Sequence, residues 1–202
     1  MTQRIESELL GSNVFVVGDD EVVLIDAGAE TQLVKNVVGG RKVLAVLLTH
    51  GHYDHCYYAN EYAKEFNCKI YSSEKIVPYL KNSDYNYSNG HFAVDDFSNF
   101  VFVNGDGQID FGKVKVQYFA LGGHSLSDVA YKIGDEIFVG DVLIGRNIGR
   151  LDLYGGNKFD MVTSLKTLQK LDFKVLYSGH GEDSKKENLI EVFSMWIKYL
   201  DR

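Results

Sequence analysis

The chain has 202 residues and a formal net charge of −7. This acidic balance disfavours binding of nucleic acid, because such binding depends on Lys and Arg side chains that neutralise phosphates. No apolar run is long enough to span a membrane, and the N-terminus lacks an apolar signal-peptide core. We therefore expect a cytoplasmic protein that binds neither nucleic acid nor a membrane.

Size and composition are those of a globular protein, with 45% hydrophobic and 24% charged residues. The length suits a single domain over residues 1–202, in which about 70% of the surface of the unfolded chain becomes buried. The two cysteines, Cys56 and Cys68, are too few for a disulfide framework. We interpret Cys56 as a small buried hydrophobic residue, the alternative being a place beside a metal.

The first half of the chain alternates β-rich and helical segments. Gly18-Asp19-Asp20 is a turn signal between two β-rich runs, which together predict a hairpin. In chain order we predict strands at 13–17 and 21–25, a helix at 30–38, strand 43–48, helix 57–66, strand 69–71 and a brief helix that contains Pro78 and is capped by Ser72 or Ser73.

The second half is richer in strands. We predict strands at 100–103, 108–111 and 114–121, a hairpin of 129–133 and 136–139, an amphipathic helix at 159–171, strand 173–177 and a closing helix at 184–200 capped by Ser184. Periodicity alone thus predicts a mixed α and β protein.

Residues 81–98 have the least regular sequence, rich in Asn, Asp, Ser, Tyr and Phe. A long polar segment with aromatic residues often serves as a lid or a binding loop. Tyr87 and His91 are therefore candidate substrate contacts, although His91 also fits the simpler interpretation of a surface residue.

The densest group of metal-binding side chains is His50-Gly51-His52-Tyr53-Asp54-His55, directly after the apolar run 43–48. Imidazole and carboxylate are ligands that divalent zinc or iron prefers. On an extended backbone His50 and His52 point to one side, and the other two follow after a turn. The simpler alternative is a solvated polar loop, but this density of ligands favours a metal site.

Three further candidate ligands each follow a strand-like run and a glycine: His124, Asp141 and His180. Glycine lets the backbone turn tightly and bring the next side chain over the ends of the strands. Each residue alone is a weak signal, because a histidine after a strand is usually structural.

The segment from His50 to His55 matches the H-x-H-x-D-H signature and resembles that of the metallo-β-lactamase superfamily, and the resemblance extends from about Asp26 to His180. It implies an α/β fold, the four-layer αβ/βα sandwich. Asp26 stands in a D-x-G that the family has after its second strand. There it would brace the metal loop from behind, the alternative being a plain turn role.

The resemblance also implies a set of metal ligands, because the three later candidates follow the signature in the family's order. One metal would be bound by His50, His52 and His124 and the other by Asp54, His55 and His180, with Asp141 bridging both. The expected cofactors are two divalent metal ions, zinc first and iron or manganese as alternatives.

Asp141 and the segment 140–156 resemble the glyoxalase II-like branch, which has a similar G-D-x-L…G-R-x-D-x-x-G-G sequence. In this segment we expect Arg150 and Asp152 to form an internal ion pair, the alternative being substrate binding. Arg146 is the candidate contact for an anionic substrate. The loop around His124 departs from the family, because the usual proline and threonine beside the ligand are absent.

The expected function is hydrolysis of an ester, thioester, lactone or related acyl bond in a small molecule. Two metals would lower the pKa of a shared water, and Asp54 would orient that water and take up its proton. A thioester is favoured on the resemblance of the loop alone.

Two other functions stay open. Persulfide dioxygenase-like members of the superfamily hold one iron, here with His50, His124 and Asp141. A non-catalytic metal-binding module is the other alternative. Nuclease members share the motif, but the acidic charge argues against that activity.

Overall fold

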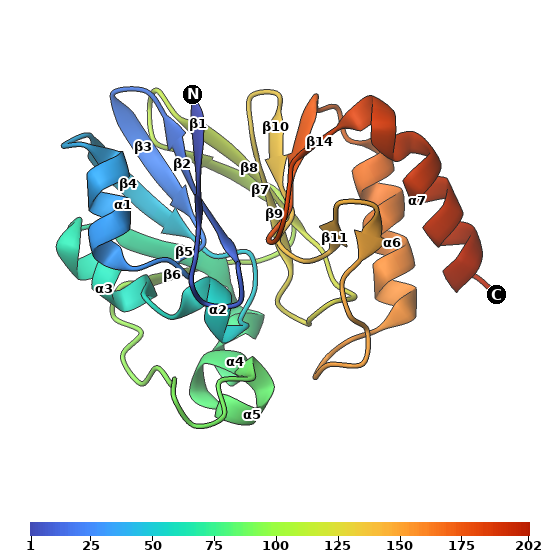
Figure 1. Ribbon diagram of the computed structural model, residues 1–202, viewed down its shortest axis with the longest axis horizontal. Helices are drawn as coiled ribbons and strands as arrows, with labels where there is room; N and C mark the ends of the chain where they lie inside the picture. The colour runs from blue at the N-terminus through green and yellow to red at the C-terminus, as the bar shows by residue number, and fades with distance from the viewer.

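The computed structural model describes residues 1–202, in which two six-stranded sheets face each other (Figure 1). The first sheet has, in spatial order, β1 (Thr2–Glu6), β2 (Asn13–Gly18), β3 (Glu21–Ile25), β4 (Lys42–Leu47), β5 (Lys69–Ser73) and β6 (Phe100–Val103). Its pairing is antiparallel from β1 to β3 and parallel from β3 to β6.

The second sheet has, in spatial order, β14 (Ser184–Lys185), β13 (Val175–Tyr177), β10 (Glu136–Phe138), β9 (Val129–Ile133), β8 (Lys115–Ala120) and β7 (Gly107–Asp110). Only β10 and β13 pair in parallel; the other neighbours are antiparallel. A small ribbon of β11 (Leu143–Ile144) and β12 (Asn147–Ile148) lies between β10 and the following helix in the sequence.

Helices cover the outer faces of both sheets (Figure 1). On the first sheet these are α1 (Thr31–Val38) and α3 (Ala59–Glu65), and on the second α6 (Lys158–Lys170) and α7 (Lys186–Leu200). The shorter helices α2 (Tyr53–Cys56), α4 (Val77–Lys81) and α5 (Ser83–Asn86) lie at the lower end of the sheets in Figure 1, and the 3-10 turn η1 (Glu74–Ile76) directly precedes α4. None of these helices combines the length and the apolar character that a membrane crossing requires.

Strand alternation produces the layers, because successive side chains of a strand point to opposite faces of its sheet. In β2, Val14 and Val16 pack with α1 and α3, whereas Phe15 and Val17 pack against the second sheet. A third cluster, which includes Leu165 of α6, fills the space between the second sheet and its helices. The four-layer αβ/βα arrangement implied by the resemblance is confirmed.

Most predicted elements lie within two residues of the observed ones. The short helix α2 and the ribbon of β11 and β12 were not predicted, and three further differences have a physical reason. Strand β1 was not predicted, because only Ile5 is buried in this edge strand and the apolar signal is weak. Part of the segment 81–98 is helical, since the Asn82 side chain caps α5. The Ser184 cap is wrong: Ser184 pairs with Leu176 in the sheet, and α7 starts two residues later.

Candidate metal centre

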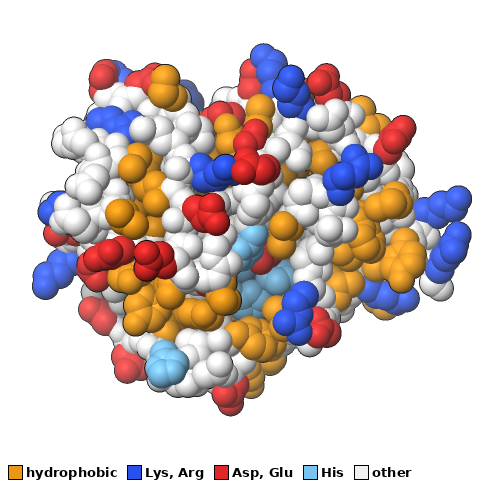
Figure 2. Space-filling model, in the orientation of Figure 1, with side chains coloured by type: hydrophobic (Ala, Val, Ile, Leu, Met, Phe, Trp, Pro, Cys, Tyr) orange, Lys and Arg blue, Asp and Glu red, His pale blue; other side chains and the backbone are white.

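The structure brings together seven side chains from four separate segments of the chain, all at the same edge of the two facing sheets. We call this group the metal cluster: His50, His52, Asp54, His55, His124, Asp141 and His180. The first two follow β4, the next two lie on α2, and the last three follow β8, β10 and β13. All are buried except His180, whose side chain is 23% exposed. Figure 2 shows histidine side chains in a hollow near the middle of the molecular surface.

Within the metal cluster, nitrogen and oxygen atoms approach one another in two groups. His52 Nδ1 lies 2.9 Å from His124 Nε2, and the ligand atoms of these two residues and His50 lie within 4.8 Å of one another. In the second group His55 Nε2 lies 3.2 Å from His180 Nε2. Asp54 Oδ2 lies 3.3 Å from the same His180 atom. These groups are the two ligand sets expected from the sequence.

Asp141 lies between the two groups. Its Oδ2 is 3.7 Å from His124 Nε2 and 3.5 Å from His180 Nε2, and its Oδ1 is 3.6 Å from His55 Nε2. The carboxylate thus approaches histidines of both groups, with Oδ2 near one histidine of each. The arrangement is the one that a bridging ligand needs.

Asp26 holds two histidines of the signature in place, His55 directly and His50 through Thr49. Its Oδ1 accepts a hydrogen bond from Thr49 N at 2.7 Å, and its Oδ2 accepts from Thr49 Oγ1 at 2.8 Å and from His55 Nδ1 at 2.9 Å. Because the single Thr49 hydroxyl proton goes to Asp26, His50 Nδ1 donates to Thr49 Oγ1, 3.0 Å away. Both histidines therefore present Nε2 to the cluster. The bracing role expected for Asp26 agrees with these bonds.

Backbone carbonyls orient two other histidines in the same way. His124 Nδ1 lies 3.0 Å from Arg150 O, and His180 Nδ1 lies 3.2 Å from Gly11 O. A carbonyl can only accept, so each Nδ1 carries the proton and each Nε2 has its lone pair available. Partners of this kind are typical of metal-binding histidines.

Two glycines allow the cluster to close. Gly140 has φ +53°, and a β-carbon there would lie 2.5 Å from Thr49 Oγ1. A β-carbon on Gly179 would lie 2.2 Å from Asp141 Oδ1. The glycine before Asp141 thus provides a turn, as expected, whereas the glycine before His180 provides room for the carboxylate.

The electrostatics of the cluster favour a positive charge at its centre. Burial lowers the pKa of His50 well below its usual value, and neighbouring histidines lower it further, so this imidazole is neutral. Burial also opposes charge on His55, but nearby Asp54, Asp141 and Asp26 outweigh it and raise the pKa to about 10. Burial acts to raise the pKa of Asp54, yet His55 and His180 outweigh it and lower the value to about 2. Asp54 is therefore an anion, and a metal cation would take the place of the proton that these carboxylates stabilise on His55.

The residues fit a pair of divalent metal ions. His50 Nε2 and Asp141 Oδ1 are buried and have no hydrogen-bond partner. Leaving such atoms unpaired is costly unless a ligand satisfies them. Histidine nitrogens 2.9 and 3.2 Å apart also need a cation or a proton between them. The set of imidazoles and carboxylates is that of zinc, iron or manganese, and no thiolate takes part.

A cavity of about 460 Å³ opens onto the cluster. Besides five members of the cluster it is lined by seven residues, which we call the rim: Leu10, Tyr53, Tyr87, Asn89, Ile144, Arg150 and Leu153. This volume suits a small molecule.

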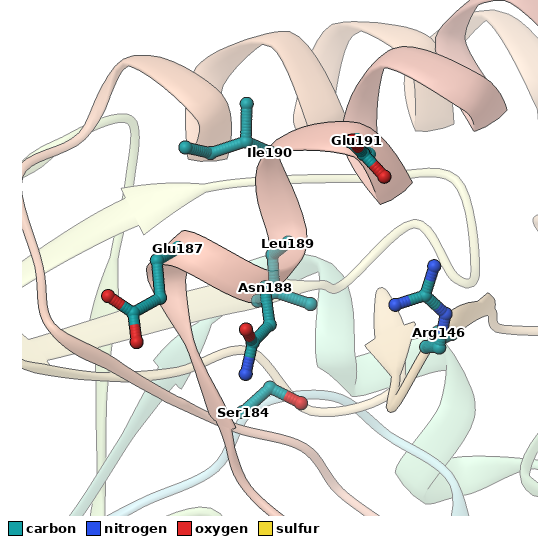
Figure 3. Close-up of a pocket in the computed structure, with 7 residues that line it drawn as sticks. All are labelled: Arg146, Ser184, Glu187, Asn188, Leu189, Ile190 and Glu191. Carbon is teal, nitrogen blue, oxygen red and sulfur yellow. The ribbon is translucent and has the colours of Figure 1, made fainter.

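Of the three candidate substrate contacts, only Tyr87 lines the cavity. Tyr87 belongs to the rim, and its ring centroid lies 5.3 Å from that of His52. Arg146 does not line the cavity: it lines another pocket, of about 600 Å³, formed with the first turns of α7 (Figure 3). The reason is its place in the turn between β11 and β12, whose backbone is bonded to Trp196. His91 is exposed and does not line the cavity, as the simpler interpretation expected.

Among the other rim residues, Arg150 was expected to meet substrate only as the alternative to an ion pair, and Leu10 was not a candidate. Arg150 forms the expected ion pair with Asp152, at 2.9 and 2.7 Å, but it also lines the cavity. Leu10 lies in the loop after β1, and no motif marks it. Asp128 is a buried carboxylate that accepts hydrogen bonds from the backbone of His124 and Ser125. Asp128 was not a candidate, and its position four residues after His124 is the one feature of the sequence that could have indicated it.

Comparisons with known proteins agree with this geometry. The profile of the metallo-beta-lactamase superfamily matches residues 8–180. The probable metallo-hydrolase YqgX of Bacillus subtilis is 29% identical over 178 residues, covering 84% of each chain. The crystal structure of the BLEG-1 B3 metallo-beta-lactamase superposes with a TM-score of 0.88 at 24% identity, covering 95% of this chain and 97% of that one. The structure of TTHA1623 in a di-iron-bound form gives a TM-score of 0.79 at 26% identity, covering 94% and 98%.

The matched profile includes the complete signature and all seven members of the metal cluster. The chain belongs to the metallo-β-lactamase superfamily.

Proposed function

We propose that the protein is a metal-dependent hydrolase with a binuclear site that cleaves an ester, thioester or related acyl bond of a small molecule. The observation that carries the proposal is the pair of ligand groups, each with three side chains, joined by Asp141. The probable metallo-hydrolase from Bacillus subtilis and the di-iron-bound form of TTHA1623 support the reaction type and the number of metals. Zinc is the metal we favour.

When bound, two divalent cations would acidify a water and polarise an acyl carbonyl. His50, His52 and His124 would hold one cation, and Asp54, His55 and His180 the other. The protein fixes the orientation of the imidazole rings, because Asp26, acting in part through Thr49, and two backbone carbonyls hold four of the five histidines in one tautomer.

Asp54 is the residue we assign to proton transfer. It is buried, lies on the first turn of α2 and lines the cavity. Its low pKa keeps the carboxylate ionised, so that Oδ1 or Oδ2 can accept a hydrogen bond from the attacking water and then its proton. Burial of the surrounding side chains keeps bulk water from this carboxylate except through the cavity.

The glyoxalase II-like assignment remains part of this proposal and rests on the segment 140–156. Its arginine and aspartate form the ion pair that the segment was expected to contain. A dioxygenase with one iron on His50, His124 and Asp141 would leave the group of Asp54, His55 and His180 without a role. We therefore favour the hydrolase, acting as one domain over residues 1–202.

The test is hydrolysis by chelator-treated protein before and after zinc is restored. A panel of thioesters, p-nitrophenyl esters and lactones is assayed, with oxygen consumption in the presence of glutathione persulfide measured on iron-loaded protein. We expect zinc-dependent cleavage of at least one acyl substrate and no oxygen uptake. Oxygen uptake with one iron per chain and no acyl cleavage would overturn the proposal.

A further inference from the structure

Strained backbone is concentrated around the cavity. Five residues other than glycine have a positive φ, namely Leu10, Asp26, Asn67, Tyr87 and Asn89. Three of the five belong to the rim, and Asp26 lies directly beneath the metal cluster. Side chains with a β-carbon avoid this conformation, and bulky ones are rare in it. Such strain persists only where the surrounding structure holds it, and it gathers at binding sites.

Leu10 is the least expected of these residues. Its φ is +54° and its side chain is 69% exposed, although glycine or asparagine would suit the backbone and a polar residue would suit the exposure. The loop that carries it is firmly held: Ser7 Oγ donates to Gly28 O and Ser12 Oγ to Asp54 O, both at 2.6 Å. A rigid loop therefore presents an apolar side chain to solvent at the mouth of the cavity.

The neighbours of Leu10 place it at one end of the metal cluster. Gly11 O accepts the hydrogen bond from His180, so Leu10 lies beside the second ligand group. Ile144 lies at the same end, because Gly145 N donates to Ser178 Oγ two residues before His180. Two aliphatic side chains from different loops thus border the cavity beside His180.

The opposite end of the cavity is aromatic and polar. Tyr87 packs its ring against His52, and its hydroxyl accepts a hydrogen bond from Tyr154 N at 2.5 Å. Arg150, the only Lys or Arg of the rim, is joined to this end through its carbonyl contact with His124. Leu153, which precedes Tyr154, is a third aliphatic residue of the rim and lies at this end as well. The aromatic ring of Tyr87 and the charge of Arg150 therefore distinguish this end from the one beside His180.

We propose that Leu10 and Ile144 form a binding site for an aliphatic group of the substrate. The substrate class is an acyl compound that has an aliphatic group on one side of its scissile bond and a polar, hydrogen-bonding group on the other. This inference rests on the proposed hydrolase function and specifies its substrate. Binding removes the exposed Leu10 side chain from water, so each methylene of the ligand that reaches it raises affinity about two- to fourfold.

The test compares wild type with Leu10→Asn, because asparagine tolerates a positive φ and removes only the apolar contact. Zinc-loaded protein is assayed with p-nitrophenyl esters from acetate to octanoate, and kcat/KM is plotted against chain length. Leu33→Asn, at an exposed leucine on α1, is the control. We expect kcat/KM to rise about two- to fourfold per methylene in wild type and control and to be nearly flat in Leu10→Asn.

A second readout does not depend on turnover. The dissociation constants of the straight-chain carboxylates from acetate to octanoate are measured by titration of the same three zinc-loaded proteins. We expect the same dependence on chain length, lost only in Leu10→Asn. If no thioester, ester or lactone is cleaved, the hydrolase proposal fails, and the carboxylate series by itself tests the aliphatic site. A flat series in wild type, or an unchanged slope in Leu10→Asn, would overturn the inference.

Discussion

The metal cluster and the rim of the cavity lie a few ångströms apart but are built in opposite ways. In the cluster, His50 and His55 are almost fully buried and are fixed by hydrogen bonds from ring nitrogens to Thr49 and Asp26. In the rim, Leu10 and Tyr87 are exposed and have strained backbones. The chain thus fixes the groups that hold metal and leaves uncovered the groups that can meet a substrate. The difference predicts that changes in the cluster affect catalysis and metal affinity, and changes in the rim affect selectivity.

The largest effect is expected for Asp54→Asn, which removes the proton acceptor of the proposed reaction. Because general-base catalysis contributes about 10²–10⁴-fold, turnover on any substrate found should fall by about that factor or more. Circular dichroism should report a folded protein. Asp95→Asn, which changes an exposed aspartate, is the control and should keep wild-type turnover. Near wild-type turnover in Asp54→Asn would remove this residue from the mechanism.

A smaller effect is expected for Asp26→Asn, which keeps the size of the side chain and its tolerance of the left-handed conformation. The amide cannot accept all three hydrogen bonds that the carboxylate accepts from Thr49 and His55. Zinc affinity should therefore fall by about 10–100-fold, which competition with a chromogenic chelator measures. The exposed Asp172→Asn should leave it unchanged. Unaltered affinity in Asp26→Asn would contradict the bracing role.

Tyr87→Phe should act on the rim and leave the cluster intact. The variant keeps the ring against His52 but loses the hydrogen bond from Tyr154 N. The free energy of unfolding should fall by about 0.5–1 kcal/mol in urea denaturation, with the metal content unchanged. Tyr57→Phe, at an exposed tyrosine for which no side-chain hydrogen bond is found, should have no measurable effect. Loss of metal from Tyr87→Phe would contradict the claim that changes in the rim leave metal binding unaffected.

The smallest effect is expected for Leu10→Asn in the absence of substrate. Asparagine is less strained than leucine at a φ of +54°, and the leucine is too exposed to contribute much packing. The free energy of unfolding should stay the same or rise by about 0.5 kcal/mol. A fall of more than about 1 kcal/mol would mean that Leu10 stabilises the fold and is not reserved for a ligand.

The same contrast explains what could be predicted from the sequence. The apolar run before His50 indicates a buried strand, and ligands that follow such strands share one edge of the fold. A ligand type, a spacing and a preceding glycine therefore indicate the candidates, and the resemblance to the family assigns them to two metals. Asp141 and His180 could be recognised because each closely follows a strand, β10 or β13, and because they follow the signature in the order of the family that it resembles.

The rim could not be predicted in this way, because its residues come from loops whose direction depends on tertiary contacts. Arg146 and Arg150 lie four residues apart in one segment, but only Arg150, whose carbonyl accepts a hydrogen bond from His124, lines the cavity. Leu10 follows an edge strand with one buried residue, so neither the strand nor the loop leaves a pattern in the sequence.

The most direct test of the account is the metal content per chain of protein purified without chelator, measured by elemental analysis. Two ligand groups bridged by Asp141 predict close to two divalent ions per chain, and close to one after His180→Ala, which removes a ligand from only the second group. No bound metal after attempted reconstitution with zinc, iron or manganese would contradict the assignment of the cluster as a metal centre.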